Sequence, residues 1–599
     1  MKYPATALLS ATLTFTLLLT ACAHQEASTP PPPELAARIE QDALNQPAPH
    51  MEKDVRMEQE MRREKKSPQR ADVKTLHAYA AAAKANAAAG GMLMAAPASI
   101  AVGDYYQTPV ENREKYQNLS DNPVKLTAQD SVSTFSLDVD TGSYSNVRRF
   151  LNQGQLPPAD AVRVEELVNY FSYDYPASLP GHPFAVSTEI ARAPWNPAHY
   201  LLRVGVKTVE KNVAAMPAAN LVFLVDVSGS MNEPAKLPLV QSTLQLLTEQ
   251  LRPQDRVALV VYAGRTAVEL ESTPGNQKEK IRAAIARLQA GGATAGEAAI
   301  RLAYAQARAG YIKGGINRIL LATDGDFNVG ISDIEQIKDM VKRERESGIS
   351  LTTLGFGQGN YQEALMEQIA DVGNGNYSYI DSLSEARKVL VEELSSTFNT
   401  VAKDVKIQME FNANQVAEWR LVGYENRVLR EEDFRNDKVD AGDVGAGKSV
   451  TALYEITPVG AATLHGEHRY GGAVAVTGKG FELGFLRIRY KQPEATKSVE
   501  LTQAVLRPEA ATLAREPSAD FRFAAAVAGF GQLLRQSPYT GTFGYGDVKL
   551  LAEKAAGSDK NAYRREFITL VELAKSLTPQ KPLNNVLTQE DHATDAGRE

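Results

Sequence analysis

The chain has 599 residues, which is too long for a single hydrophobic core, so two to four domains are expected. Charged residues make up 23% of the chain and hydrophobic residues 43%, as in an ordinary globular protein. The net charge of -7 is mild, and lysine and arginine are spread along the chain, which argues against a nucleic-acid partner.

The amino terminus has the pattern of a secretory signal. Lys2 is followed by an apolar stretch over residues 5–20, which is shorter than the ~20 residues that a membrane-spanning helix needs. Residues 19–22 are LTAC, which resembles the lipobox of bacterial lipoproteins and implies that Cys22, the lone cysteine, is acylated. The alternative is a plain secretory signal. Because Ala23 follows the cysteine, the resemblance implies the outer membrane, facing the periplasm, with the inner membrane as the alternative.

Residues 23–127 are rich in alanine, proline and charged residues and poor in aromatic ones. A segment of this composition cannot bury enough apolar area to offset the entropy of folding. We therefore expect a disordered tether, with a helix near residues 51–66.

Near Ser131 the sequence changes to apolar patterns typical of strands and helices. The sequence predicts a strand, then a helix that Ser143 caps and Gly154 ends, and then a second helix over VRVEELVNYF. Two alternating apolar stretches within residues 184–207 predict a pair of antiparallel strands.

Asp138 and Asp140 precede the first of these helices. They do not fit the DxDxT phosphatase pattern, because Gly142 stands in the last position. A calcium loop of the EF-hand type also fails, because Arg149 stands where a glutamate is required. We interpret the two aspartates as structural.

Strand-like and helix-like stretches alternate from residue 220 to residue 398. The predicted strands are LVFLVD, RVALVVYA, AVELEST, RILLATDG, SLTTLGFG and NYSYID. Between them, apolar residues recur at helical spacing. This alternation predicts a mostly parallel, doubly wound α/β sheet.

The chain is β-rich from residue 400 and helical again between Ser518 and Leu577. Strand-like segments therefore lie on both sides of the α/β region. We hypothesise that the α/β domain is inserted into a β domain, which a doubly wound domain with adjacent termini permits.

Oxygen-bearing side chains lie at the ends of the predicted strands. Asp226, Ser228 and Ser230 follow the first strand of the α/β region. Thr294 lies in a glycine-rich loop before a helix, and Asp324 follows the fourth strand. A DxSxS string alone is equally well explained as a turn with a helix cap. All five residues together, at the sheet edge where α/β proteins bind ligands, predict a site for Mg²⁺, with Mn²⁺ or Ca²⁺ as alternatives.

Residues 220–398 resemble a von Willebrand factor type A domain with a metal-ion-dependent adhesion site, through DVSGS, the loop of Thr294 and the TDG motif. In that family, serine and threonine side chains bind Mg²⁺ directly or through water, and a carboxylate of a partner protein completes the coordination. The resemblance gives these roles to the positions of Asp226, Ser228, Ser230, Thr294 and Asp324.

Residues 131–577 also resemble the bacterial YfbK-like family of lipoprotein-type von Willebrand A proteins. The supporting stretches are SYSNVRRFLNQGQLPPADAVRVEELVNYF, KLPLVQSTLQLL, GGINRILLATDGDFNVG, YENR and DFRNDKVDAGDVGAGKSVTALYEITP. The resemblance implies a doubly wound von Willebrand A (Rossmann-like) α/β domain, flanked by a β-rich domain and a C-terminal helical segment.

The expected organisation follows from these features. It comprises a lipoprotein signal peptide (1–22), a disordered tether (23–127), an N-terminal α+β module (128–217), the von Willebrand A domain (218–398), a β-rich domain (399–515), a C-terminal helical segment (516–580) and a disordered tail (581–599).

Two glycine patterns suggest nucleotide binding but lack its context. Residues 442–449 fit GxxxxGK[ST], yet charged residues precede them and a strand-like stretch follows, so we expect a hairpin turn. The glycines of GFGQGN, residues 355–360, suit a strand-to-helix turn. We therefore expect no bound nucleotide.

The sequence offers no catalytic arrangement of serine, histidine and aspartate, and its eight histidines lack metal-ligand spacing. Ser228 also stands where a dehalogenase-like nucleophile mechanism requires a second aspartate. We expect a binding module and not an enzyme: a membrane-anchored envelope protein that grips an acidic residue of an unknown partner protein through Mg²⁺. The alternatives are a metal-dependent hydrolase and an envelope scaffold whose metal is purely structural.

Overall fold

The computed structural model describes residues 113–178, 181–211, 213–292, 296–325, 334–466 and 480–579. These residues all belong to one compact unit, Gln107–Glu599. The predicted signal peptide with Cys22, the tail and most of the tether lie outside the described residues. Within the described ranges, no helix is both long and apolar enough to cross a membrane.

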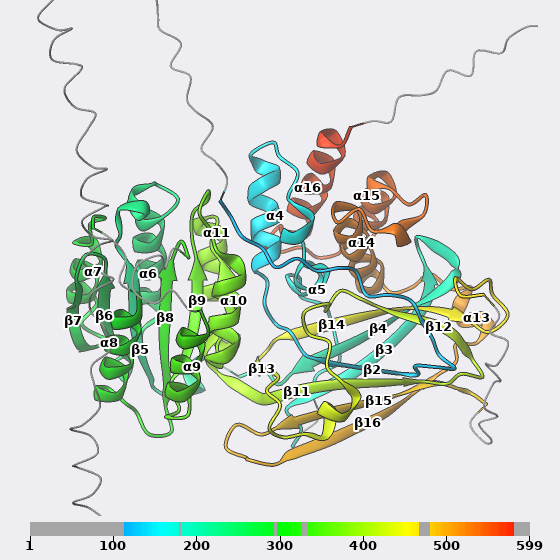
Figure 1. Ribbon diagram of the computed structural model, residues 1–599, viewed down its shortest axis with the longest axis horizontal. Helices are drawn as coiled ribbons and strands as arrows, with labels where there is room; N and C mark the ends of the chain where they lie inside the picture. Colours follow the sequence, from blue (N-terminus) through cyan, green and yellow to red (C-terminus); the bar gives the residue numbers. More distant parts are fainter. Residues whose placement is uncertain are drawn as a thin grey trace, which may run out of the picture. The chain divides into compact units, whose positions relative to one another are not determined.

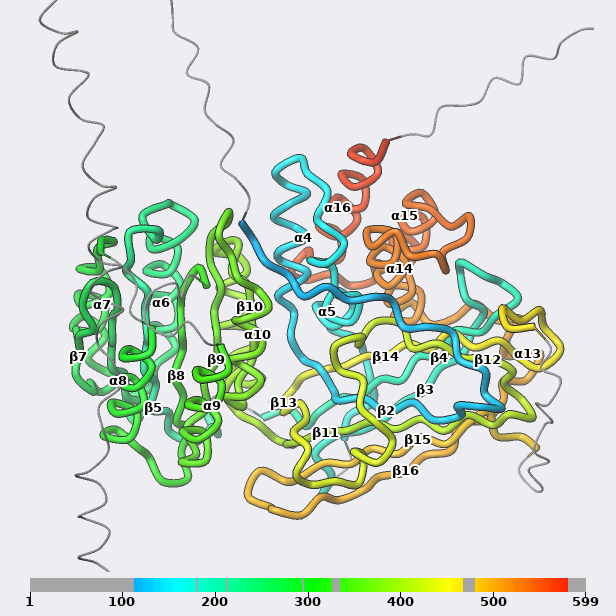
Figure 2. Tube along the Cα trace, viewed as in Figure 1, coloured from blue at the N-terminus to red at the C-terminus, as the bar shows by residue number. Residues whose placement is uncertain are grey.

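A six-stranded sheet has the order β10-β9-β8-β5-β6-β7 (Figures 1 and 2). Its strands are parallel except for β7, which pairs antiparallel with β6 at one edge. The strands are β5 (Ala219–Asp226), β6 (Arg256–Tyr262), β7 (Thr266–Pro274), β8 (Ile316–Thr323), β9 (Ser350–Gly355) and β10 (Tyr377–Tyr379). Every residue of β5 is buried, as in the centre of a parallel sheet.

Helices cover both faces of this sheet. Leu221 and Phe223 of β5 pack with apolar residues of α6 and α7, whereas Val222 and Leu224 pack with α8, α9 and α10. The helices are α6 (Leu237–Gln250), α7 (Lys278–Ala286), α8 (Gly296–Ala309), α9 (Ile334–Arg345), α10 (Glu363–Val372), α11 (Leu383–Arg387) and α12 (Leu394–Phe398). Alternate residues of β5 thus pack against helices on opposite faces of the sheet. The predicted doubly wound α/β fold is confirmed.

Strands from before and after the α/β domain share two further sheets. One has the order β1-β12-β14-β4-β3; the other contains β13, β11, β15 and β16, with β2 paired to β11. The strands are β1 (Lys125–Leu126), β2 (Val132–Ser136), β3 (Phe184–Ala193), β4 (Asn196–Thr208), β11 (Thr400–Phe411), β12 (Val416–Val422), β13 (Gly442–Gly445), β14 (Ser449–Pro458), β15 (Glu482–Lys491) and β16 (Ser498–Leu506). Both sheets contribute to one apolar core, which includes Leu202, Trp419 and Leu486. The pairing of β4 with β14 makes the α/β domain an insertion between two halves of a β-rich part.

The glycine pattern at residues 442–449 runs from β13 into β14. A strand therefore follows it where a phosphate loop requires a helix. The expected hairpin turn is nevertheless wrong, because β13 pairs with β11 in one sheet while β14 pairs with β4 and β12 in the other.

Residues 113–127 belong to the folded part, although we expected the tether to reach residue 127. The Arg113 N–H donates to the carbonyl of Gly359 at 2.7 Å, and β1 pairs with β12. Figure 2 shows this segment passing from the α/β domain to the β-rich part. Backbone hydrogen bonds hold residues 113–127 against the folded part. Amino-acid composition does not reveal such bonds, so the tether was predicted too long.

Helices from both ends of the described chain form one apolar cluster on the sheet of β4, β12 and β14. They are α4 (Gly142–Asn152), α5 (Val164–Asn169), α14 (Ala519–Leu534), α15 (Tyr545–Glu553) and α16 (Tyr563–Leu577), with the short α13 (Ala510–Leu513) preceding α14.

The predicted cap of α4 is wrong. Thr141 precedes the helix, and Ser143 lies inside it. The Ser143 N–H donates to Glu166 Oε2 at 2.8 Å, and its hydroxyl donates to the Ala161 carbonyl. A carboxylate from α5 thus takes the role that a local serine would have had at the start of α4.

The cap of α14 gives a local test of the helical cluster. Ser518 Oγ accepts a hydrogen bond from the Phe521 N–H at 3.1 Å and donates one to Glu189. Ser518→Ala should cost about 1 kcal/mol of helix stability, measured as roughly fivefold faster amide hydrogen exchange in the first turn of α14. Ser558→Ala, in an exposed loop, is the control and should leave those rates unchanged; equal rates in both variants would contradict the capping role.

Candidate metal centre

Asp226 is the last residue of β5 and is fully buried. Its Oδ1 accepts a hydrogen bond from the Ser228 N–H at 2.8 Å, and its Oδ2 accepts one from the Thr323 hydroxyl at 2.9 Å. Burial raises the pKa of Asp226 to about 6; the charge of Asp324 adds to this shift and the hydrogen bonds oppose it. The two carboxylates are thus close enough to repel each other.

Two hydroxyl groups lie beside this carboxylate. Ser228 is buried, and its Oγ lies 3.0 Å from Ser230 Oγ. The alternation of serine and glycine after a strand places both hydroxyls in one tight turn, as the DVSGS motif predicts.

The glycine-rich loop before α8 lies against this turn. The Gly229 N–H donates to the Gly292 carbonyl at 3.0 Å, and the Gly291 N–H donates to the Val227 carbonyl at 2.7 Å. Thr294 itself lies outside the described residues, so its predicted role as a ligand stays a prediction.

Asp324 follows β8, the parallel neighbour of β5, and is fully buried. Lys236 Nζ lies 3.1 Å from Asp324 Oδ2, and the Asn360 amide donates to the same oxygen at 3.1 Å. Lys236 also donates to Asn360 Oδ1 at 3.0 Å. These three side chains form a polar group at the same edge of the sheet as Asp226.

Lys236 and Asn360 were not among the predicted site residues. Lys236 is only 2% exposed, just before α6. Gly357 has a positive φ of 78°, and a Cβ there would overlap the aliphatic part of the Lys236 side chain. Gly357, the second glycine of GFGQGN, thus leaves room for the lysine, a role that its place in the sequence does not reveal.

The donor set fits a hard divalent cation. The candidate ligands among the described residues are the carboxylates of Asp226 and Asp324 and the hydroxyls of Ser228 and Ser230, all of them oxygens. The carboxylates of Asp226 and Asp324 lie close enough to interact, and Lys236 already compensates the charge of Asp324. The structure therefore brings together the four described residues of the predicted site.

Family models match three parts of the chain. Residues 110–203 match the model "von Willebrand factor", residues 220–393 match "von Willebrand factor type A domain", and residues 396–577 match "Uncharacterized protein YfbK, C-terminal". The inserted α/β domain is thus a von Willebrand A domain, a fold that serves in general for protein interaction.

One curated relative matches most of the chain. "Uncharacterized protein YfbK" of Escherichia coli (strain K12) is 52% identical over 500 residues, which cover 82% of this chain and 86% of that protein. The human inter-alpha-trypsin inhibitor heavy chain H4 is 27% identical over 36% of this chain, but over only 23% of its own length. A solved von Willebrand factor type A structure from Catenulispora acidiphila aligns with 14% identity and a TM-score of 0.37, over 65% of this chain and 91% of that one. The chain belongs to the YfbK family of von Willebrand factor type A domain proteins.

Proposed function

We propose that this protein binds an acidic segment of a partner protein through a Mg²⁺ ion held by Asp226, Ser228, Ser230, Thr294 and Asp324. The observation that carries the proposal is the convergence of four of these side chains at the carboxyl ends of β5 and β8, which are neighbouring strands. Residues separated by almost a hundred positions supply oxygen atoms to one edge of the sheet.

The chain's own groups suit binding of a carboxylate. The serine hydroxyls are neutral ligands, so they leave more of the metal's charge available than carboxylates would. Mg²⁺, when bound, supplies an electrophilic centre for an incoming carboxylate oxygen. Asp226 is held by two hydrogen bonds, which keeps its oxygens fixed before a partner arrives.

Binding is favoured over hydrolysis because hydrolysis requires a positioned base or nucleophile. Two of the described histidines, His199 and His465, pair with Glu455 and Glu418 in the β-rich part. Among the described residues at the site, the base-type side chain is Lys236, and it is paired with Asp324. We therefore propose a binding protein and not an enzyme.

The proposed location is the bacterial cell envelope. The LTAC motif supports acylation of Cys22, and the alanine- and proline-rich residues that follow would allow the folded part to reach partners away from the membrane. Ala23, a residue other than aspartate after the cysteine, supports sorting to the outer membrane, with the inner membrane as the alternative.

The test is capture of partners from an envelope extract with the full chain as bait. Asp226→Ala, or chelation of wild type with EDTA, should reduce the captured partner at least about tenfold, because one lost ligand typically weakens metal binding by that much or more. Asp339→Ala, which removes an exposed carboxylate on α9, is the matched control and should capture as wild type does. Capture of the same proteins in equal amounts under all conditions would refute the metal-dependent interaction.

A further inference from the structure

Part of the connection from β9 to α10, residues 357–362, lies at the metal centre; we call it the Asn360 loop. The Asn360 amide donates to Asp324 Oδ2 at 3.1 Å. A Cβ added to Gly325, the residue after Asp324, would lie 2.8 Å from the backbone nitrogen of Gln362. The loop therefore packs directly against the turn that carries a candidate metal ligand.

The start of the described chain lies alongside this loop. The Arg113 N–H donates to the Gly359 carbonyl at 2.7 Å, and the Lys115 N–H donates to the Tyr361 carbonyl at 2.9 Å. These two carbonyls belong to the residues on either side of Asn360. Backbone hydrogen bonds thus hold the loop both before and after its site residue.

A side chain of the same segment adds a third bond; we call this segment, residues 113–116, the strap. Glu114 Oε1 accepts a hydrogen bond from the Gly359 N–H at 2.8 Å, and the Glu114 side chain is 2% exposed. Its Oε2 pairs with Arg149 Nη2 of α4 at 2.9 Å and accepts a hydrogen bond from the Tyr116 hydroxyl at 2.6 Å. One oxygen of Glu114 thus binds the loop while the other is fixed by α4.

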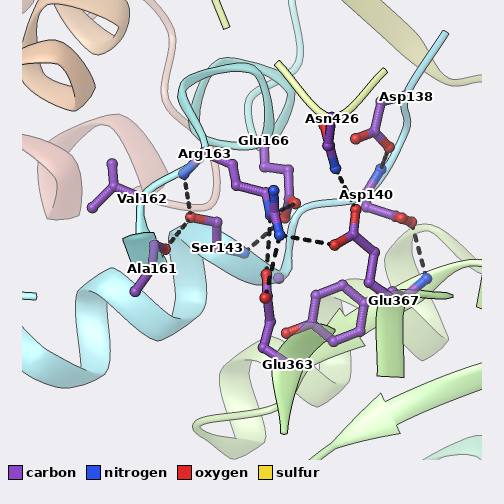
Figure 3. Close-up of polar contacts among 12 residues, drawn as sticks. Asp138, Asp140, Ser143, Ala161, Val162, Arg163, Glu166, Glu363, Glu367 and Asn426 are labelled. Atoms are coloured by element: carbon purple, nitrogen blue, oxygen red, sulfur yellow. Dashed lines mark hydrogen bonds and ion pairs between the residues drawn. The ribbon is translucent and has the colours of Figure 1, made fainter. Parts of the chain in front are cut away.

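The helix that follows the loop is also held from outside the α/β domain (Figure 3). α10 begins at Glu363, directly after the loop. Arg163, which precedes α5, donates from Nε to Glu363 Oε1 at 3.0 Å and from Nη2 to Oε2 at 3.3 Å. Both side chains are buried, so water and salt screen this pair little. The parts of the chain that flank the α/β domain therefore hold the loop and the start of α10 together.

These contacts form a continuous path to the metal centre. It leads from α4 through Glu114 to the backbone of Gly359, and from the neighbouring Asn360 to Asp324. Asp324 is fully buried, so a displaced Asn360 would leave its carboxylate with fewer donors. Carboxylates that bind metal depend on such outer hydrogen bonds for their orientation.

We propose that the strap positions Asn360 at the metal centre, and that its attachment to the loop sets the affinity of the site for Mg²⁺. The inference rests on the function proposed above, because it concerns the same metal site. Glu114 acts through Asn360, and Asn360 acts through Asp324, so both are positioning residues. The strap continues directly into the stretch that leads back to Cys22. Metal affinity, and with it partner binding, then depends on whether the amino-terminal end of the chain keeps these contacts.

The test is calorimetric titration of the full chain with Mg²⁺, with Asp226→Ala as the baseline that identifies the heat of the site. Asn360→Ala should weaken binding at least about tenfold, because a donor to the ligand carboxylate is lost. Glu114→Ala, which acts through one further link, should weaken it roughly threefold or more. Glu114→Gln keeps an oxygen that can accept from the Gly359 N–H, so it should lose less affinity than Glu114→Ala.

Glu385→Ala is the matched control. Glu385 is 1% exposed and pairs at 2.7 Å with Arg148, the neighbour of Arg149 on α4. The substitution thus removes an equally buried contact between α4 and the α/β domain, through α11 and not through the Asn360 loop. The affinity for Mg²⁺ should change less than about twofold.

Hydrogen exchange of the Gly359 amide gives a second measurement that needs no metal. In EDTA, exchange should be roughly threefold or more faster in Glu114→Ala than in wild type, because the acceptor of this N–H is lost. The Glu385→Ala chain should exchange this amide as wild type does.

Unchanged affinity for Mg²⁺ in Glu114→Ala or Asn360→Ala, when circular dichroism shows the chain folded, would overturn the proposal, since the contacts would then serve stability alone. Failure of the proposed function looks different. Wild type would then bind no more Mg²⁺ than Asp226→Ala does, whereas exchange of the Gly359 amide would still respond to Glu114→Ala.

Discussion

Arg427→Met should lower the free energy of unfolding by about 3–5 kcal/mol, since removing one partner of a buried ion pair leaves uncompensated charge. The Arg427 guanidinium lies 3.2 Å from Asp138, 3.4 Å from Asp140 and 3.1 Å from Glu367, and it also pairs with Asp371. Methionine keeps much of the apolar volume of the arginine side chain, so the loss of stability reflects mainly the removed charge. Urea unfolding followed by tryptophan fluorescence measures this loss of stability. Trp195 and Trp419 both lie in the β-rich part, so their fluorescence reports its unfolding.

The loss should depend on pH. Burial already raises the pKa of Asp140 well above its usual range, and losing Arg427 raises it further. A folded state whose carboxyl pKa values exceed those of the unfolded state binds more protons, so stability falls as pH rises through this range. Arg427→Met should therefore be less destabilising at pH 5 than at pH 8.

Arg430→Met is the control for this substitution. Arg430 lies three positions away, but its side chain is 73% exposed, so water screens its pairs with the exposed Glu432 and the less exposed Asp433. Such pairs contribute roughly 0–1 kcal/mol. If Arg427→Met lowered the free energy of unfolding no more than Arg430→Met at pH 8, the carboxylates that pair with Arg427 would not be ionised as these ion pairs require.

The α/β domain was predictable because its signals are local. A continuous apolar run such as LVFLVD is buried on both faces wherever it lies in a parallel sheet, and the helices between the strands have their own apolar periodicity. The pairing of β4 with β14 is different, because it joins segments more than two hundred residues apart. Local pattern shows that both are strands but not that they are neighbours.

Some elements have too weak a local pattern to be found. β16 has no counterpart among the predicted strands, because it lies at a sheet edge where Val505 is its one buried residue. The start of α4 is another case: Glu166, twenty-three positions from Ser143, satisfies the backbone N–H that a local cap would otherwise have bound.

In the candidate site, too, some residues could be predicted from local pattern and others could not. Asp226 ends a strand, and Ser228, Ser230 and Asp324 follow strands, so the order of strands in the sheet was enough to bring them together. Lys236 reaches Asp324 from the start of α6 through space left by a glycine of another loop. That contact depends on tertiary packing, which no spacing in the sequence encodes.

Lys236→Met tests how this lysine and a metal ion share the site. Lys236 Nζ is a buried cation 3.1 Å from a fully buried carboxylate oxygen of Asp324. In EDTA, the substitution should destabilise the α/β domain by about 3 kcal/mol, because a charge partner is lost from a desolvated site. Hydrogen exchange of the β5 and β8 amides measures the local stability, since these strands carry Asp226 and Asp324 at their ends.

Mg²⁺ should restore much of that loss. A ligand at a hundred times its Kd stabilises the folded state by about 2.7 kcal/mol, and the gain should be larger in Lys236→Met than in wild type, where Lys236 competes for Asp324. Lys338→Met, which removes a pair with Glu335 on the surface of α9, should show neither the loss nor the extra gain. Equal Mg²⁺ stabilisation of all three chains would mean that Asp324 does not contribute to metal binding. A larger gain confined to Lys236→Met would place the lysine and the ion in competition for the same carboxylate.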